Sequence, residues 1–307
     1  MHSRQRRFAN IAAFTLAEML LSFGVLLLLI LAVAQVTNSS TSATTHVFKQ
    51  MDTDEEARMI LDRMGSDFDR MIKRADVDYV FLKQSGNDAM WFYSEAPSYY
   101  PPADGNNVSI DGSAKSSVAL VGYRINSTYK LDRLGKGLTW DRTASPKSSV
   151  FLTYPSGSST PITASTLAGN WPTTVTTTST DRDYNLISDQ VYRLEFSFLL
   201  KDGTLSVNQY IAPNTAINGF KDVAAIVVGI AMLDRNSRNI VKRDTANPTL
   251  LDSTIASQMI SALPDAEAGK PIAQTWTNSP YLTASAIPQA AAAEIRFYQR
   301  YFYLYTK

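Results

Sequence analysis

The feature that most constrains this chain is an apolar run near its start, over residues 14–36. The run contains a single charged side chain, Glu18. An α-helix rises about 1.5 Å per residue, so a helix over this run is about 34 Å long and can cross a hydrocarbon core of about 30 Å. Arg4, Arg6 and Arg7 precede the run and favour a cytoplasmic N-terminus. The sequence therefore predicts a single-pass membrane protein whose body lies on the far side, which is the periplasm in a cell that has one.

Glu18 is the unusual residue of this run, because a carboxylate at the edge of a membrane span is costly and marks a functional site. A cleaved secretory signal is one explanation of the run, but such a signal has a shorter apolar core and small residues at a cut site directly after it. An uncleaved signal anchor explains the length and the arginines. In that case Glu18 reaches back to the cytoplasmic interface and has no further role.

A third explanation accounts for the acid as well. Residues 13–20 read Ala-Phe-Thr-Leu-Ala-Glu-Met-Leu, a stretch that resembles the prepilin signature of type IV pilins and type II secretion pseudopilins. The resemblance implies cleavage between Ala13 and Phe14 by a prepilin peptidase and N-methylation of Phe14. Glu18 then becomes the fifth mature residue, where the family carries an acid. Ala13 stands where the family usually has glycine.

The resemblance also implies a function. The expected protein is a non-enzymatic pilin-like structural subunit of the inner membrane, with a cytoplasmic N-terminus and a periplasmic head. Its expected partners are the peptidase and other pilin-like subunits, and no cofactor, metal or nucleic acid is expected. The Glu18 carboxylate of one subunit would pair with the Phe14 amine of a neighbour, since a buried charge without a partner is costly. The large head favours a minor subunit of a type II secretion or type IV pilus-like system.

Residues 37–45 are almost all Ser, Thr and Asn, which compete for backbone hydrogen bonds, so we expect the helix to weaken or break there. Helical periodicity then resumes up to about residue 74. One stripe is apolar and is expected to pack on the head: Met51, Ala57, Ile60, Leu61, Met64, Phe68, Met71 and Ile72. The charged positions between them are expected to face solvent or neighbouring subunits: Asp54, Glu55, Glu56, Arg58, Asp62, Arg63, Asp67, Asp69, Arg70 and Lys73.

From residue 75 onward the pattern changes to period two with β-forming residues. We expect strands at 77–83, 89–93, 118–125, 131–140, 191–199, 223–233 and 295–304, a helix at 252–263, and long loops at 97–117 and 154–179. The predicted fold class is α+β, with a long N-terminal helix packed on a mainly antiparallel β-sheet head. The expected domains are a leader at 1–13, a transmembrane and assembly helix at 14–36, a linker and amphipathic helix at 37–74, and the head at 75–307.

The order of these elements carries a narrower resemblance. Asp67-x-x-Arg70, Val121-x-Tyr123 and Leu131-x-Arg133 are followed by expected strands at 186–198 and 222–234. This succession is similar to the J-type minor pseudopilin of type II secretion and to the prepilin-like cassette protein C group of verrucomicrobial genomes. It implies that the head belongs to the larger minor pseudopilins.

Composition excludes several kinds of chemistry in the head. The chain has no cysteine, and its two histidines are His2 and His46, so thiolate sites and a Ser-His-Asp triad in the head are excluded. The aromatic strand at 297–305 is interpreted as a sheet edge or core strand rather than a stacking surface. Three carboxylate pairs are interpreted as caps or turns rather than calcium sites: Asp52 with Asp54, Asp76 with Asp78, and Asp181 with Asp183. The alternative function is a membrane-anchored periplasmic binding module or hydrolase that uses the apolar segment only as a tether.

Overall fold

The computed structural model describes residues 15–73, 79–99, 115–137, 184–214, 220–241, 253–279 and 288–304. The chain divides into two compact units, Met1–Met51 and Asp52–Lys307. Below, we call the second unit the head.

The first element is one continuous helix, α1 (Leu16–Asp69). The interruption expected at residues 37–45 is therefore wrong. Three hydroxyls in this region donate to the carbonyl oxygen four residues earlier: Thr37 to Val33 at 2.8 Å, Thr44 to Ser40 at 2.8 Å, and Thr45 to Thr41 at 2.9 Å. A side chain bonded in this way leaves the helical backbone bonds intact instead of competing with them.

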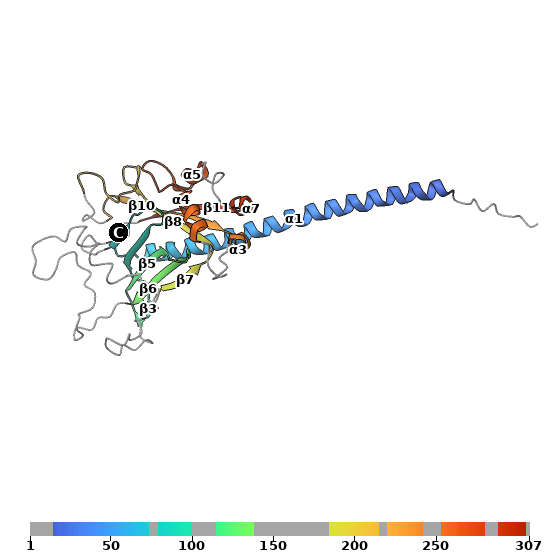
Figure 1. The fold of residues 1–307 in the computed structure, drawn as a ribbon. Coiled ribbons are helices and arrows are strands. Elements are labelled where there is room, and N and C mark those ends of the chain that lie inside the picture. Colours follow the sequence, from blue (N-terminus) through green and yellow to red (C-terminus); the bar gives the residue numbers. More distant parts are fainter. Residues whose placement is uncertain are drawn as a thin grey trace, which may run out of the picture. The chain divides into compact units, whose positions relative to one another are not determined.

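The head contains two main antiparallel sheets, whose arrangement can be followed in Figure 1. The first sheet has the order β1-β2-β5-β6-β7. Its strands are β1 (Tyr79–Leu82), β2 (Ala89–Ser94), β5 (Ala119–Ile125), β6 (Leu131–Gly137) and β7 (Tyr184–Ser188). Gly86 makes the turn between β1 and β2 with a φ of 94°, so these two strands form an antiparallel hairpin. A two-residue pair, β3 (Ser98–Tyr99) with β4 (Lys115–Ser116), lies outside the two main sheets.

The second sheet has the order β11-β10-β8-β9. Its strands are β8 (Val191–Leu200), β9 (Leu205–Ser206), β10 (Val223–Leu233) and β11 (Ile295–Tyr303), and β11 forms one edge. The single strand expected at 186–198 is wrong, because the chain turns after Ser188 and passes from the first sheet to the second. The Ser188 hydroxyl accepts the backbone N–H of Gln190 at 3.0 Å and that of Val191 at 3.3 Å, which closes this turn.

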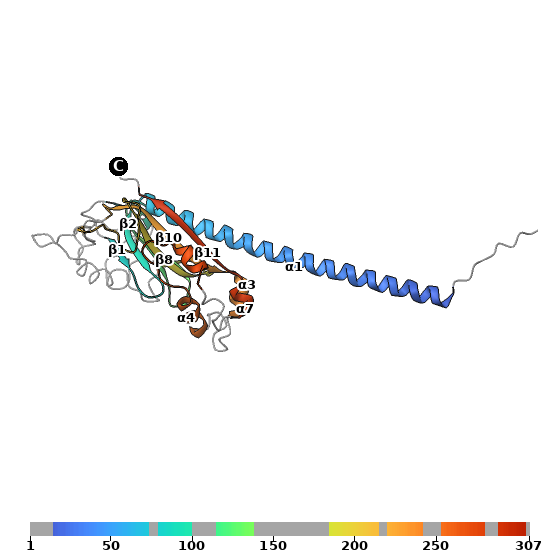
Figure 2. The same ribbon diagram turned by 90° about the horizontal axis from the view of Figure 1, so that it is seen from above.

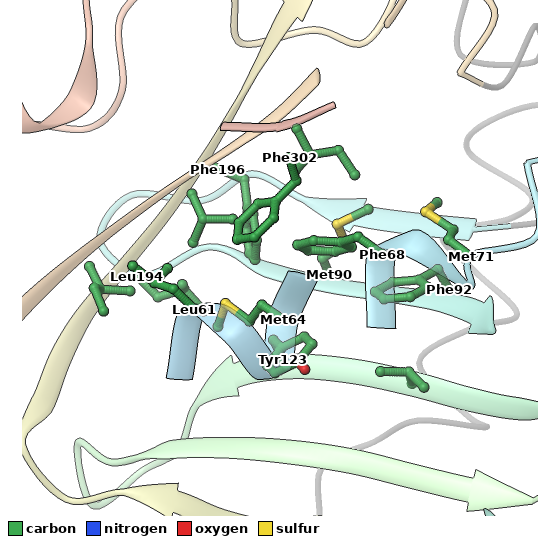
Figure 3. Packing of buried hydrophobic residues seen from close by; sticks show 14 of the residues in the cluster. Leu61, Met64, Phe68, Met71, Met90, Phe92, Tyr123, Leu194, Phe196 and Phe302 are labelled. Carbon is green, nitrogen blue, oxygen red and sulfur yellow. The ribbon is translucent and has the colours of Figure 1, made fainter. Parts of the chain in front are cut away.

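The main core of the head contains residues of α1 and of both sheets. Figure 3 shows Leu61, Met64 and Phe68 of α1 among side chains from both sheets. Phe68 contacts Phe92 of the first sheet and Phe302 of the second, with ring centroids 5.2 Å apart in both cases. The amphipathic stripe predicted for this helix is thus confirmed as a packing face, although Met51 remains 58% exposed. The full burial of one Leu, Met or Phe side chain of this stripe stabilises the fold by roughly 1.5–3 kcal/mol.

β10 explains why one stretch of the sequence is apolar at every position. Its even-numbered residues from Ile226 to Met232 belong to the main core, while Val227, Ala231 and Leu233 belong to a second core on the opposite face. That second core also contains residues of four helices: α3 (Arg235–Val241), α4 (Ser253–Ser261), α5 (Ile272–Thr277) and α7 (Gln289–Ala292). Figure 2 shows α3, α4 and α7 beside the sheet from a second direction. The prediction of a buried central strand at 223–233 is confirmed.

The predicted fold class is also confirmed, since a long apolar N-terminal helix is combined with antiparallel sheets against which it packs. The sequence pattern did not distinguish two sheets from one. Several expectations fall wholly or partly outside the described residues: the leader at 1–13, the start of the strand at 77–83, the end of the strand at 131–140, and most of the two long loops.

Candidate functional site

The apolar half of α1 presents its large side chains to the surroundings rather than to the rest of the protein. Every large apolar residue from Leu16 to Val36 is exposed, and the best 18-residue window has a mean hydropathy of 2.6 with none of its residues buried. Residues 16–36 of a helix span about 31 Å. By length and composition, this helix can cross a membrane.

Glu18 lies in the first turn of α1, where it forms a capping box with Thr15. The Glu18 Oε2 atom accepts the Thr15 backbone N–H at 2.9 Å and the Thr15 hydroxyl at 3.0 Å. In return, the Thr15 Oγ1 atom accepts the Glu18 backbone N–H at 3.3 Å. This reciprocal arrangement satisfies two donors that a helix start otherwise leaves unpaired.

Sequence reasoning missed this capping role, although the Thr-x-x-Glu spacing that signals it is visible in the sequence. Glu18 therefore has hydrogen-bond partners within its own chain. Ala13 and Phe14, between which cleavage is expected, lie outside the described residues.

A buried ion pair holds the end of α1 to the first sheet of the head. Arg133 of β6 donates to the Asp67 carboxylate through Nε at 2.7 Å and Nη2 at 2.9 Å. The Tyr123 hydroxyl of β5 donates to the same carboxylate at 2.5 Å. Burial, reinforced by the Asp67 charge, raises the pKa of Tyr123 well above its ordinary value, so this phenol remains a donor.

Asp67 corrects one expectation, because it is 3% exposed whereas the helical pattern placed it among solvent-facing charges. A carboxylate pays a large desolvation cost unless it is paired and hydrogen-bonded, and Asp67 has three donors that meet this requirement. The three residues come from the segments that carry the resemblance to the J-type pseudopilin. Tyr123 and Arg133 lie 56 and 66 positions after Asp67 in the sequence, and the fold brings their side chains together.

A second charged cluster lies where the β1–β2 hairpin meets β8. Lys83 directly follows β1, and its Nζ atom lies 2.9 Å from Asp88 Oδ2 and 2.5 Å from Glu195 Oε2. Both carboxylate side chains are completely buried, while the Lys83 side chain is 29% exposed. Backbone N–H groups complete the cluster, since Phe196 donates to Asp88 at 2.9 Å and Ala266 donates to Glu195 at 3.1 Å.

The electrostatics of this cluster follow from burial and charge. Burial, with a smaller contribution from the Asp88 charge, raises the pKa of Glu195 to about 8, against the opposing effect of the Arg193 and Lys83 charges. Burial also raises the pKa of Asp88. Burial lowers the pKa of Lys83, but the Glu195 and Asp88 charges raise it by more. Because both carboxylates are shielded from solvent, this pair is not arranged to act on an external substrate.

The remaining candidates serve the packing of the head. Asp54 of the first carboxylate pair accepts the Tyr298 hydroxyl at 2.6 Å, and the other two pairs lie outside the described residues. No group of three or more potential metal ligands occurs in the part of the chain that the structure describes. The aromatic strand is confirmed as a sheet edge, because β10 is the one neighbour of β11 among the described strands, and Phe297 packs on Trp276 at 5.7 Å between ring centroids.

Comparison with known protein families and with curated proteins found no match for this chain.

Proposed function

We propose that this protein is a pilin-like structural subunit, specifically a minor pseudopilin of a type II secretion or type IV pilus-like system. The observation that carries the proposal is the helix α1. Its first half is apolar and exposed and starts at an acid in its first turn, while its last turns are built into a globular head. A helix of this kind suits a protein that is held in the inner membrane and assembled through the helix.

In the proposed pathway, the N-terminus lies in the cytoplasm and the head in the periplasm. A prepilin peptidase cuts between Ala13 and Phe14, and the new Phe14 amine is methylated. Other pilin-like subunits then contact the apolar half of α1. The Glu18 carboxylate pairs with the Phe14 amine of a neighbour, which compensates the cost of placing both charges among apolar helices.

Mass spectrometry of the mature N-terminus tests the processing step. The chain is expressed in a host that carries a prepilin peptidase, and the expected product begins at methylated Phe14. Ala13→Leu is the control, because a bulky side chain at the cut site should leave the leader in place. An intact start at Met1, or a cut after Val36, would contradict the proposal.

The capping box allows the two roles of Glu18 to be tested separately. Glu18→Gln keeps a hydrogen-bond acceptor at the capping position but removes the charge, so this variant should insert and be cut yet fail to enter filaments. Thr15→Ala removes the cap but keeps the charge, so it should still be incorporated. Incorporation is measured by crosslinking to neighbouring subunits in membranes. Normal incorporation of Glu18→Gln would show that charge pairing is not required.

A further inference from the structure

The cluster of Lys83, Asp88 and Glu195 contains the groups needed to form a covalent bond within the chain. The Lys83 amino group and the carboxyl groups of Asp88 and Glu195 meet here, with one carboxyl oxygen of each acid at 2.9 and 2.5 Å from the same nitrogen atom. They come from both sheets of the head, since Lys83 and Asp88 flank the β1–β2 turn and Glu195 lies within β8. Neither carboxylate is accessible to an external partner, so any chemistry here takes place between these side chains.

We propose that Lys83 and Glu195 condense to an amide that cross-links the two sheets, with Asp88 as the proton acceptor. The Lys83 ammonium gives one proton to the Asp88 carboxylate, and the neutral amine attacks the carbonyl carbon of the Glu195 carboxylic acid. A C–N bond forms, the C–OH bond breaks, and one water molecule leaves. Asp88 ends protonated, no group is oxidised or reduced, and no co-reactant is needed.

Glu195 is the better electrophile of the two acids. A neutral carboxylic acid is attacked more readily than a carboxylate, and complete burial favours the neutral form of both acids. What distinguishes Glu195 is a guanidinium on its second oxygen. The Arg193 Nη2 atom lies 2.8 Å from Glu195 Oε1, on the oxygen that Lys83 does not contact. A guanidinium in this position stabilises the negative charge that develops on that oxygen during attack. The Arg193 side chain is itself completely buried, so water does not screen its charge.

Asp88 is placed to accept the proton. Its Oδ2 atom contacts the Lys83 ammonium and also accepts the Phe196 N–H at 2.9 Å, while Oδ1 accepts the Gln84 N–H at 3.3 Å. These backbone donors fix the orientation of the carboxylate beside the amine. Because the amine and the acid are held next to each other, amide formation becomes a reaction within one molecule. Holding the two groups in place in this way can account for a large part of the reduction in the activation barrier.

The proposed bond would connect positions 112 residues apart in the chain. It would constrain the unfolded chain in the way a disulfide does, in a protein that contains no cysteine. The inference does not depend on the proposed function, because it concerns only contacts inside the head.

Intact-mass spectrometry of the denatured full-length chain, purified from membranes in detergent, tests the proposal. The wild-type mass should be lower by one water molecule than the mass of the same polypeptide calculated from its sequence. Lys83→Arg keeps the positive charge but lacks the amine, so its mass should equal the calculated one. Proteolysis should then release a peptide pair from the wild type in which Lys83 is joined to Glu195.

Asp88→Asn tests the proton acceptor and should abolish or greatly slow the loss of water. Near-UV circular dichroism establishes that each variant is folded before its mass is interpreted. A folded wild-type chain at its full calculated mass would overturn the proposal, as would a loss of water that persists in Lys83→Arg. A link mapped to Asp88 instead of Glu195, or complete cross-linking of Asp88→Asn, would overturn the assigned roles.

Discussion

The two halves of α1 differ both in how many large apolar residues they carry and in the surroundings of those residues. In residues 16–36 the apolar side chains point in every direction around the helix and are all exposed. In residues 52–69 they occupy one stripe and are buried, apart from the exposed Met59, with Ile60, Met64 and Phe68 completely enclosed. A helix that is apolar all round requires an apolar medium, whereas a helix with one apolar stripe requires a sheet or another helix on that side.

The comparison teaches that the number of apolar residues and their distribution around a helix together decide what the helix needs as a partner. The buried half is held by specific contacts of the head, such as the Asp67–Arg133 ion pair. The large apolar side chains of the other half are all exposed. Substitutions in the two halves should therefore have very different effects on the stability of the head.

The largest difference in effect between the two halves is expected when a phenylalanine in each half is replaced by alanine. Phe68→Ala leaves a cavity between Phe92 and Phe302 and should lower the free energy of unfolding of the head by about 3–5 kcal/mol. Phe23→Ala, in the exposed half, should leave it unchanged. Denaturant unfolding of the full chain in detergent measures both, followed by the fluorescence of the buried Trp91 and Trp276. Equal effects of the two substitutions would remove the distinction between the halves.

Within the buried half of α1, a buried ion pair and an exposed ion pair should also differ in how much they stabilise the head. Arg133→Ala leaves the buried Asp67 carboxylate without its main partner and should cost about 3–5 kcal/mol. Arg300→Ala removes a partner of Asp62, which is largely exposed on the same helix, and should cost less than about 1 kcal/mol. The same unfolding assay applies. A small effect of Arg133→Ala would mean that Asp67 finds solvent or another donor.

The smallest of the three differences in stability is expected when a glycine in each half is replaced by leucine. A Cβ atom added at Gly65 would lie 3.0 Å from a ring carbon of Phe302, whereas one added at Gly24 would meet nothing within 4 Å. Gly65→Leu should therefore destabilise the head by about 1–3 kcal/mol through overpacking. Gly24→Leu should have no effect on the head. The midpoint of thermal unfolding is sufficient to rank the two variants, and a stabilised Gly65→Leu would show that the helix has room to move away from β11.

The sequence predicted well those features that depend on neighbours along the chain. Alternation located β2, β5 and β8. The Lys-Asp-Gly-Thr stretch after β8 is typical of a turn and forms one, in which Gly203 has a φ of 87° and the Asp202 side chain accepts the Thr204 N–H. The capping box of Thr15 and Glu18 also depends on local spacing alone. The Thr-x-x-Glu spacing therefore makes it predictable from the sequence.

Features that depend on distant parts of the chain were not predictable in the same way. Helical periodicity places Asp67 among the solvent-facing charges, and only the folded position of Arg133 makes its burial possible. Lys83 and Glu195 are likewise ordinary residues of a hairpin and a strand until the two sheets meet. Patterns of period two identify strands but do not say which sheet each strand joins, so the passage from β7 to β8 between sheets was missed.

The edge position of β11 has a consequence for copies of the protein that are crowded in one plane. Among the described strands, the nine-residue β11 has a neighbour on one side alone, and the open side of such an edge strand can join the sheet of a second molecule. If two copies paired through this edge in antiparallel fashion about Tyr298, Arg296 of each would stand opposite Arg300 of the other. Like charges in directly opposed positions disfavour such pairing. The arginines of this strand thus act as a barrier against sheet-to-sheet aggregation, and this barrier should weaken as ionic strength rises.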